Sequence, residues 1–186
     1  MKRHMITTAL VLLSTLSLHA EQTEFAVEID PATYAFEGYS VHLKMTPAQL
    51  PQLQLGIGVY AMDFPDIFVD MHSKNKDKGW DVRLDRGIGF FADYYFDDSQ
   101  EGWFAGAQLA RQRYEIGLHG EQSSYDVTLI MAHGGYRYNI NDHWYLKAWG
   151  GVGYAKKTSG SNVVAGEVYD VPDVVPFGAL HVGYRF

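Results

Sequence analysis

The chain has 186 residues, a formal net charge of −7, 15% aromatic residues and no cysteine. This length is enough for one domain with a sizeable core, and the lack of cysteine excludes a disulfide framework or a thiolate metal site. The acidic balance argues against nucleic acid as a partner, and against binding to anionic lipid by charge alone.

The first twenty residues have the pattern of a secretory signal peptide. MKRHM supplies a cationic start, ITTALVLLSTLSL an apolar run, and LHA a cleavage site before Glu21. The alternative is a membrane anchor, but the apolar run is shorter than the roughly 20 residues that a spanning helix needs. We therefore expect residues 1–20 to be a signal peptide and residues 21–186 to form the exported domain.

From there on, apolar residues alternate with polar or small ones at a period of two, which is typical of strands with two unlike faces. No stretch of ten residues has a convincing helical pattern. Apolar sets of this kind include Leu53, Leu55, Ile57 and Val59, and later Val127, Leu129 and Met131. The alternation predicts eight strands, at about residues 23–29, 34–46, 52–62, 82–96, 103–116, 124–139, 143–156 and 174–186.

The connections between these strands alternate in length. Those after strands two, four and six are the short segments TPAQLP, DDSQEG and NIND, whereas residues 62–81 and 156–173 form long ones after strands three and seven. Short turns on the periplasmic side and long loops outside are the pattern of an outer-membrane barrel. An even number of strands also places both chain ends at the periplasmic rim.

A soluble eight-stranded barrel of the lipocalin type is the alternative. Three features favour the membrane: long strands, aromatic residues at both strand ends, and continuous apolar faces opposite faces of glycine and polar residues. The aromatic residues at the loop side include Tyr60, Trp80, Tyr114, Tyr125 and Tyr154. We therefore predict an all-β fold, an eight-stranded antiparallel up-and-down transmembrane β-barrel.

The chain ends on GALHVGYRF, a strand with one apolar face formed by Leu180, Val182, Tyr184 and Phe186. With this ending, the whole segment 21–186 resembles the small eight-stranded outer-membrane β-barrels of the OmpA/OmpX/OmpW type. The resemblance implies that these four residues form the assembly signal read by the barrel assembly machinery. It also implies a place in the outer membrane of a Gram-negative cell, in contact with outer-membrane lipid and lipopolysaccharide.

Polar residues of both charge signs lie on the faces predicted to point inward. The predicted lumen network comprises His42, Lys44, Arg83, Asp85, Asp93, Arg137, Lys147, His181 and Arg185. Eight strands leave an interior just wide enough for side chains, so the first hypothesis is a plug of paired charges. The alternative is a narrow channel or a pocket of a small-ligand carrier, which requires a gap between these side chains.

The long segment 63–81 contains the apolar residues Ile67, Phe68, Val69 and Met71. Such a run in a loop indicates contact with lipid headgroups, an external partner, or a lid over the barrel mouth. Lysines of the same segment can contact lipopolysaccharide phosphates or simply form a solvated loop tip. The favoured function is therefore a structural or loop-mediated interaction role.

A lipid A acyltransferase or deacylase is the third functional class, because small outer-membrane barrels include such enzymes. It would need a serine, a histidine and a carboxylate near the outer rim. The few candidates are His72 and Ser73 beside Asp70, and Ser123, Ser124 and Asp126 after His119, and no His-x-Ser-Asn run is present. The aspartates of segment 63–81 lack the spacing of a calcium loop. We therefore expect no catalytic site, metal or cofactor.

Overall fold

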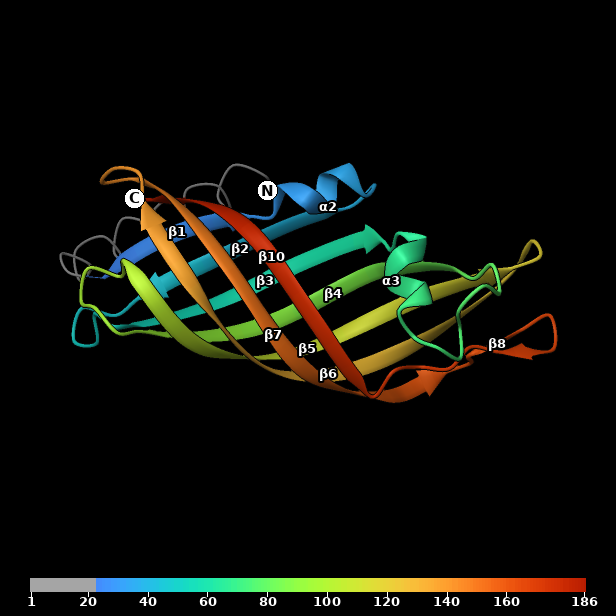
Figure 1. The fold of residues 1–186 in the computed structure, drawn as a ribbon. Coiled ribbons are helices and arrows are strands. Elements are labelled where there is room, and N and C mark those ends of the chain that lie inside the picture. Colours follow the sequence, from blue (N-terminus) through green and yellow to red (C-terminus); the bar gives the residue numbers. More distant parts are fainter. Residues whose placement is uncertain (1–22) are drawn as a thin grey trace, which may run out of the picture.

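The computed structural model describes residues 23–186, so the predicted signal peptide lies outside the described residues. Eight strands close into an antiparallel barrel in the order β1-β10-β7-β6-β5-β4-β3-β2 (Figure 1). Consecutive strands pair along the chain, and the pairing of β1 with β10 closes the ring. The predicted fold class, an eight-stranded up-and-down β-barrel, is therefore confirmed.

The barrel strands are β1 (Glu24–Ile29), β2 (Tyr39–Thr46), β3 (Leu53–Asp63), β4 (Asp81–Tyr95), β5 (Gly102–Leu118), β6 (Glu121–Asn139), β7 (Trp144–Gly160) and β10 (Val174–Arg185). The connections add two short helices and a small hairpin: α2 (Pro31–Ala35), α3 (Asp66–Asp70), β8 (Val163–Val164) and β9 (Glu167–Val168). Within residues 23–186, no helix is long and apolar enough to cross a bilayer.

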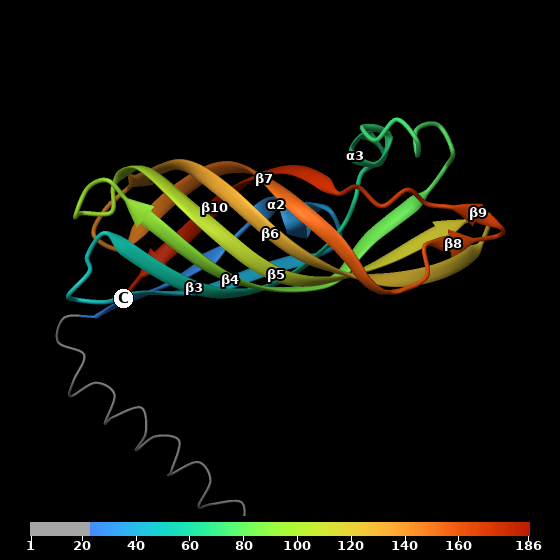
Figure 2. The same cartoon turned by 90° about the horizontal axis from the view of Figure 1, so that it is seen from below.

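The two ends of the barrel differ as the connection lengths predict. The turn end carries the short connections 47–52, 96–101 and 140–143, together with the start of β1 and the end of β10. The loop end carries residues 64–80 with α3 and residues 161–173 with β8 and β9, beyond the long strands β5, β6 and β7 (Figure 2). One connection at the loop end is shorter than expected, because His119 and Gly120 join β5 to β6 with φ of 53° and 85°, as in a two-residue hairpin.

The strand predicted at residues 34–46 is shorter than the alternation indicated. The Asp30 carboxylate accepts a hydrogen bond of 3.0 Å from the Ala32 amide, and Pro31 occupies the first helical position. Both features are favourable at a helix start. Residues 31–35 therefore form the helix α2, and β2 begins only at Tyr39. Capping chemistry thus overrides the period-two pattern here, with consequences for the barrel wall described below.

Large apolar side chains cover the outside of the barrel. Phe90, Leu109 and Ile130 lie on neighbouring strands, and each is more than half exposed. An aromatic belt follows at the turn end, with exposed Tyr94, Phe96, Trp103, Tyr138, Trp144 and Phe186. A water-exposed sheet does not present such a continuous apolar surface, whereas a lipid-facing one does.

Candidate functional site

Four charged side chains meet inside the barrel, and we call them the charged plug: Glu28 from β1, Lys44 from β2, Asp93 from β4 and Lys147 from β7. None is more than 2% exposed. The ammonium nitrogens of Lys147 and Lys44 lie 2.6 and 3.2 Å from Asp93 Oδ2. The same two nitrogens lie 3.7 and 3.6 Å from the Glu28 carboxylate. Two acids therefore balance two bases across the lumen.

The remaining oxygens of the two plug acids are also satisfied. Glu28 accepts hydrogen bonds from Tyr145 Oη at 2.9 Å and from His181 Nδ1 at 3.0 Å. Trp149 Nε1 in turn donates to His181 Nε2 at 3.3 Å, so the His181 ring bridges Trp149 and Glu28. Asp93 Oδ1 accepts from His133 Nε2 at 2.6 Å. Such complete partnering offsets the cost of burying these charges.

Inward glycines make room for these large side chains. An ideal Cβ at Gly58 would collide with the His42 ring, and one at Gly183 would collide with the Tyr145 ring. Each glycine therefore lets a side chain of a neighbouring strand lie flat against the wall. The lumen accommodates more polar side chains than a uniform barrel wall would allow.

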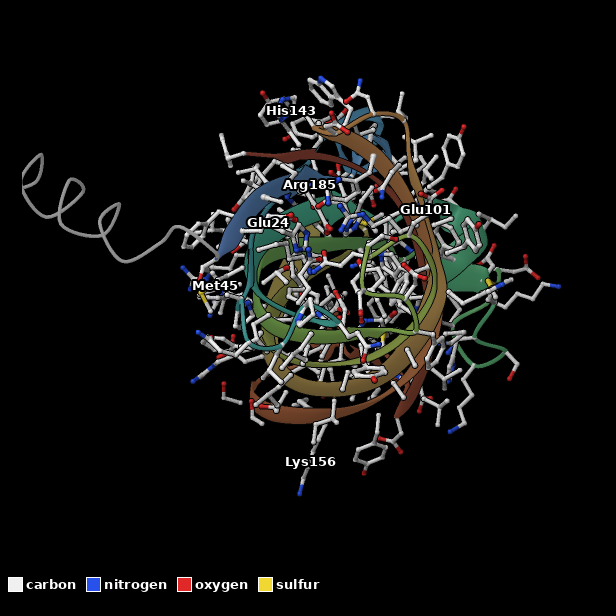
Figure 3. The ribbon with its side chains drawn as sticks, turned by 90° about the vertical axis from the view of Figure 1, so that its left-hand side faces the viewer. Glu24, Met45, Glu101, His143, Lys156 and Arg185 are labelled. Atoms are coloured by element: carbon white, nitrogen blue, oxygen red, sulfur yellow. The ribbon has the colours of Figure 1, made fainter. Side chains whose placement is uncertain are left out.

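The connection 96–101 closes the lumen at the turn end. The Gln100 side chain points inward and donates to Thr46 Oγ1 at 2.6 Å and to the Pro51 carbonyl at 2.9 Å. Arg137 donates to Gln100 Oε1 at 2.8 Å and lies 3.6 Å over the Tyr145 ring. Viewed from this end, side chains converge inside the ring of strands (Figure 3). These side chains thus cover the charged plug on the side of the turn end.

The structure brings together most of the predicted lumen network, with different surroundings for each residue. His42, Lys44, Asp93, Arg137, Lys147 and His181 are buried in the lumen. Arg185 lies at the rim of the turn end, 3.4 Å from Glu24. The sequence-based prediction of the lumen network did not include Glu28 and His133. The alternation of Glu28 with the outward residues Val27 and Ile29 could have placed Glu28 inside.

The inward assignment of Arg83 and Asp85 is wrong. The ladders shift register between Tyr60 and Met62 on β3 and between Leu84 and Arg86 on β4, which inverts the faces above these bulges. Buried Val82 and Leu84 take the inward side. Arg83 binds the Asp63 carboxylate and the Glu37 carbonyl instead, and Asp85 has no partner in the β4–β5 ladder.

The loop-end half of the lumen is apolar, and we call it the apolar cup. Its buried core comprises Val69, Trp80, Val82, Ala110, Ile116, Leu118, Tyr125, Val127, Leu129, Met131, Ala155, Val164 and Tyr169. The apolar set of β6 therefore faces inward, not toward lipid, and Trp80, Tyr114 and Tyr125 form no outer belt. For the part of the wall around Val127, the physical reason is that exposed Arg86, Arg111 and Lys156 stand on its outside, where charged groups require water (Figure 3 shows Lys156 pointing away).

Two cavities lie in the apolar cup. The inner one, of about 70 Å³, reaches His42, Trp149 and His181. The outer one, of about 250 Å³, lies under α3 and is lined by Val69, Val127 and Tyr169, among other apolar residues. Both share Phe64, Tyr114, Val175 and Phe177, so they adjoin each other.

The loops cover part of the outer cavity. Val69 of α3 is buried in the cup, and Tyr169 packs edge-on against Trp80 at 5.3 Å. Burial raises the pKa of Tyr169 to about 12, so its phenol stays neutral. Asn75 and Asp170 tie the two long loops together, because each donates to the other, at 2.8 and 2.9 Å.

Histidines and serines do not assemble into the catalytic arrangement considered from the sequence. His72 binds Asp170 at 3.2 Å, and Ser124 accepts from Arg113 at 2.7 Å. A different pair, Ser40 Oγ and His42 Nε2, lies 2.8 Å apart, but His42 Nδ1 has no hydrogen-bond partner to orient the ring. Within residues 23–186, no three His, Asp or Glu side chains cluster as metal ligands.

No protein-family model matches the chain, and no curated protein sequence matches it. Among solved structures, the chain is similar to neisserial surface protein A (NspA), with 18% identity and a TM-score of 0.51 over 88% of this chain and 94% of NspA. The chain has the fold of a small outer-membrane β-barrel. A major outer membrane protein of Thermus thermophilus aligns with 15% identity and a TM-score of 0.47, over 88% of this chain and 99% of the other.

Proposed function

We propose that this small outer-membrane β-barrel lies in the outer membrane and binds an apolar small molecule in its apolar cup. The observation that carries the proposal is the pair of adjoining cavities: the outer one has aromatic and aliphatic walls, and the inner one adds a group of polar side chains that includes His42 and His181. Enclosed apolar pockets with a small number of polar groups are the usual form of small-molecule sites. The proposal corresponds to the small-ligand carrier considered as an alternative in the sequence analysis, with its pocket at the loop end of the barrel.

The charged plug argues against a channel for solutes. A solute crossing the lumen would have to separate Lys147 from Asp93 at 2.6 Å and pass Gln100 and Arg137 below them. Breaking a buried ion pair costs about 3–5 kcal/mol, which a passing solute has no means to supply. The lumen is therefore closed at the turn end, and the binding site lies in its loop-end half.

The loop segment 63–81 acts as the lid of this site, in our proposal. Val69 faces the cup, while Phe68, Met71 and His72 line the outer cavity. Ile67 is 70% exposed. This side chain favours an additional contact of α3 with lipid headgroups or an external partner. The assembly role of the terminal strand, whose Leu180 and Phe186 are exposed, stays a prediction.

The binding test uses cis-parinaric acid, a fluorescent fatty acid, added from water to the protein refolded in phospholipid vesicles. Ala155 on β7 is buried and lines the outer cavity, so Ala155→Trp fills the cavity. Val152 on the same strand is 58% exposed on the outside, so Val152→Trp is the matched control. We expect saturable binding to the wild type and to V152W, and its loss in A155W. Equal binding to all three proteins would refute the site.

The location is tested by single cysteines, because the chain has none of its own. Lys76 lies in the loop after α3, and Asp98 lies in a connection of the turn end. A membrane-impermeant maleimide should label Lys76→Cys on intact cells and Asp98→Cys only after permeabilisation. Labelling in the opposite order would show the reverse orientation, and labelling of neither after permeabilisation would contradict membrane insertion.

A further inference from the structure

The barrel wall has a notch between β10 and β2. β1 pairs with β10 only as far as Ile29 with Val182, and with β2 only as far as Glu28 with His42. Beyond this point residues 174–181 of β10 and residues 39–41 of β2 have no strand between them. Figure 1 shows β10 diverging from β2 past the end of β1.

The helix α2 occupies this place without closing the wall. Within residues 23–186, the backbone hydrogen bonds of segment 30–38 run inside that segment and to Asp63, and none reaches β10. Pro176, which has no N–H to donate, lies on the free part of β10, as is usual for a strand edge. The backbone edge of β10 therefore has no hydrogen-bonded strand beside it, although α2 packs close to it.

The notch faces the apolar belt. On one side, Leu180 and the β7 residue Val152 are more than half exposed. On the other side, Val41 and its β3 partner Val59 are each 43% exposed. An open sheet edge is not tolerated in contact with hydrocarbon, and irregular backbone at membrane depth occurs where it lines a cavity.

Both cavities reach the notch. The inner cavity is lined from one side by Asp30, Thr33 and Ser40, and from the other by Phe177, Ala179 and His181. The outer cavity is lined by Val174, Pro176 and Gly178, which alternate with the inward residues of β10 and so belong to its outer face. The apolar cup is thus continuous with the side of the barrel as well as with its mouth.

We propose that the apolar cup takes one acyl chain of a membrane lipid, which enters sideways through the notch. The inference rests on the proposed function and names its ligand class and route. The chain exchanges a hydrocarbon environment for the apolar cavities without crossing water, while its polar end stays outside the barrel wall. A headgroup at the membrane surface need not enter.

Trp149 is a built-in reporter, because its ring lines the inner cavity. The variant Trp80→Phe, Trp103→Phe, Trp144→Phe leaves Trp149 alone, and Trp80 Nε1 has no hydrogen bond to lose. This protein is reconstituted in vesicles of phosphatidylcholine brominated along the acyl chains, which quench nearby tryptophan. The control protein carries Trp149→Phe and Phe104→Trp in the same background, so its one tryptophan lies at position 104. Phe104 is 2% exposed beside the charged plug, so this reporter measures the quenching caused by lipid outside the intact barrel wall.

We expect the fractional loss of fluorescence to be larger for Trp149 than for the position-104 reporter. Ala179→Phe fills the inner cavity at the notch and should return the loss at Trp149 to that baseline. Leu180→Phe, on the outer face of the same strand, should leave the loss unchanged. Should the cavity-filling variant not fold, the two reporters alone decide the question.

Baseline quenching at Trp149 with intact cis-parinaric acid binding would overturn the lateral route and leave the proposed function standing. Such a result would mean that ligands enter from water through the mouth. Baseline quenching together with no binding of cis-parinaric acid would overturn both proposals.

Discussion

The most direct test of the charged plug is Asp93→Asn. The substitution keeps the shape of the side chain but removes the carboxylate that lies 2.6 Å from Lys147 and 3.2 Å from Lys44. Glu28 alone, at 3.6 and 3.7 Å, then balances two buried ammonium groups. The charged plug therefore retains one uncompensated positive charge, and His133 loses its charged hydrogen-bond partner.

The expected loss of unfolding free energy is about 3–5 kcal/mol, the usual cost of removing one member of a buried ion pair. The matched control is Glu24→Gln, which breaks the pair with Arg185 at the rim. Those side chains are 31% and 17% exposed, so we expect the control to cost no more than about 1 kcal/mol. Since a typical domain is stable by about 5–15 kcal/mol, the two outcomes are easily separated.

The assay is urea unfolding of the barrel refolded in phospholipid vesicles, followed by tryptophan fluorescence. The double variant Asp93→Asn, Lys147→Met removes one charge of each sign and should recover part of the lost stability. A D93N protein as stable as E24Q would refute the reasoning, because it would show that water, not the acid, stabilises the two lysines. A double variant less stable than D93N would also contradict it.

Three further outcomes follow from the structure. Leu129→Ala should cost about 2–5 kcal/mol in the same unfolding assay, because Leu129 is buried in the apolar cup, whereas Ile130→Ala on the lipid-facing side should cost less. Gly120→Ala should cost roughly 1 kcal/mol, because Gly120 has a φ of 85° and lies in the tight β5–β6 turn. Asn75→Ala breaks both bonds to Asp170 and should speed the entry of cis-parinaric acid from water, measured by stopped-flow fluorescence, without abolishing its binding.

The barrel could be predicted from the sequence because alternation is a local signal. Leu55 and Ile57 face outward, and Gln54 and Gly58 inward, simply because successive side chains of a strand point to opposite faces. The final strand follows the same rule, with Leu180 outward and buried His181 inward. The period-two alternation, the lengths of the connections and the even number of strands are together sufficient to predict the fold.

The polarity of each face could not be predicted in the same way, because it depends on what lies outside the wall. Val127 has the same local pattern as Ile57, yet it faces inward, because the outer face of this part of β6 carries the polar residues Asp126 and Thr128. A bulge at Asp85 similarly reverses the faces around Arg83, and one extra residue leaves no clear mark in the sequence. The depth of a residue along the barrel and the register of its strand are set by the closed barrel, so the local sequence does not reveal them.

The notch and the charged plug are two parts of one arrangement. β1 ends at Ile29 because Asp30 and Pro31 start α2, and Glu28, one residue before that end, is one of the two acids of the plug. The wall is therefore fully paired where the lumen is charged, and open where the lumen is apolar. An open edge beside the plug would expose buried charges to lipid, whereas the unpaired edge of β10 beside the apolar cup lies next to α2 and lines a cavity, which is where irregular backbone occurs at membrane depth. The length of β1 thus decides both where the lumen is sealed and where a lipid chain can enter.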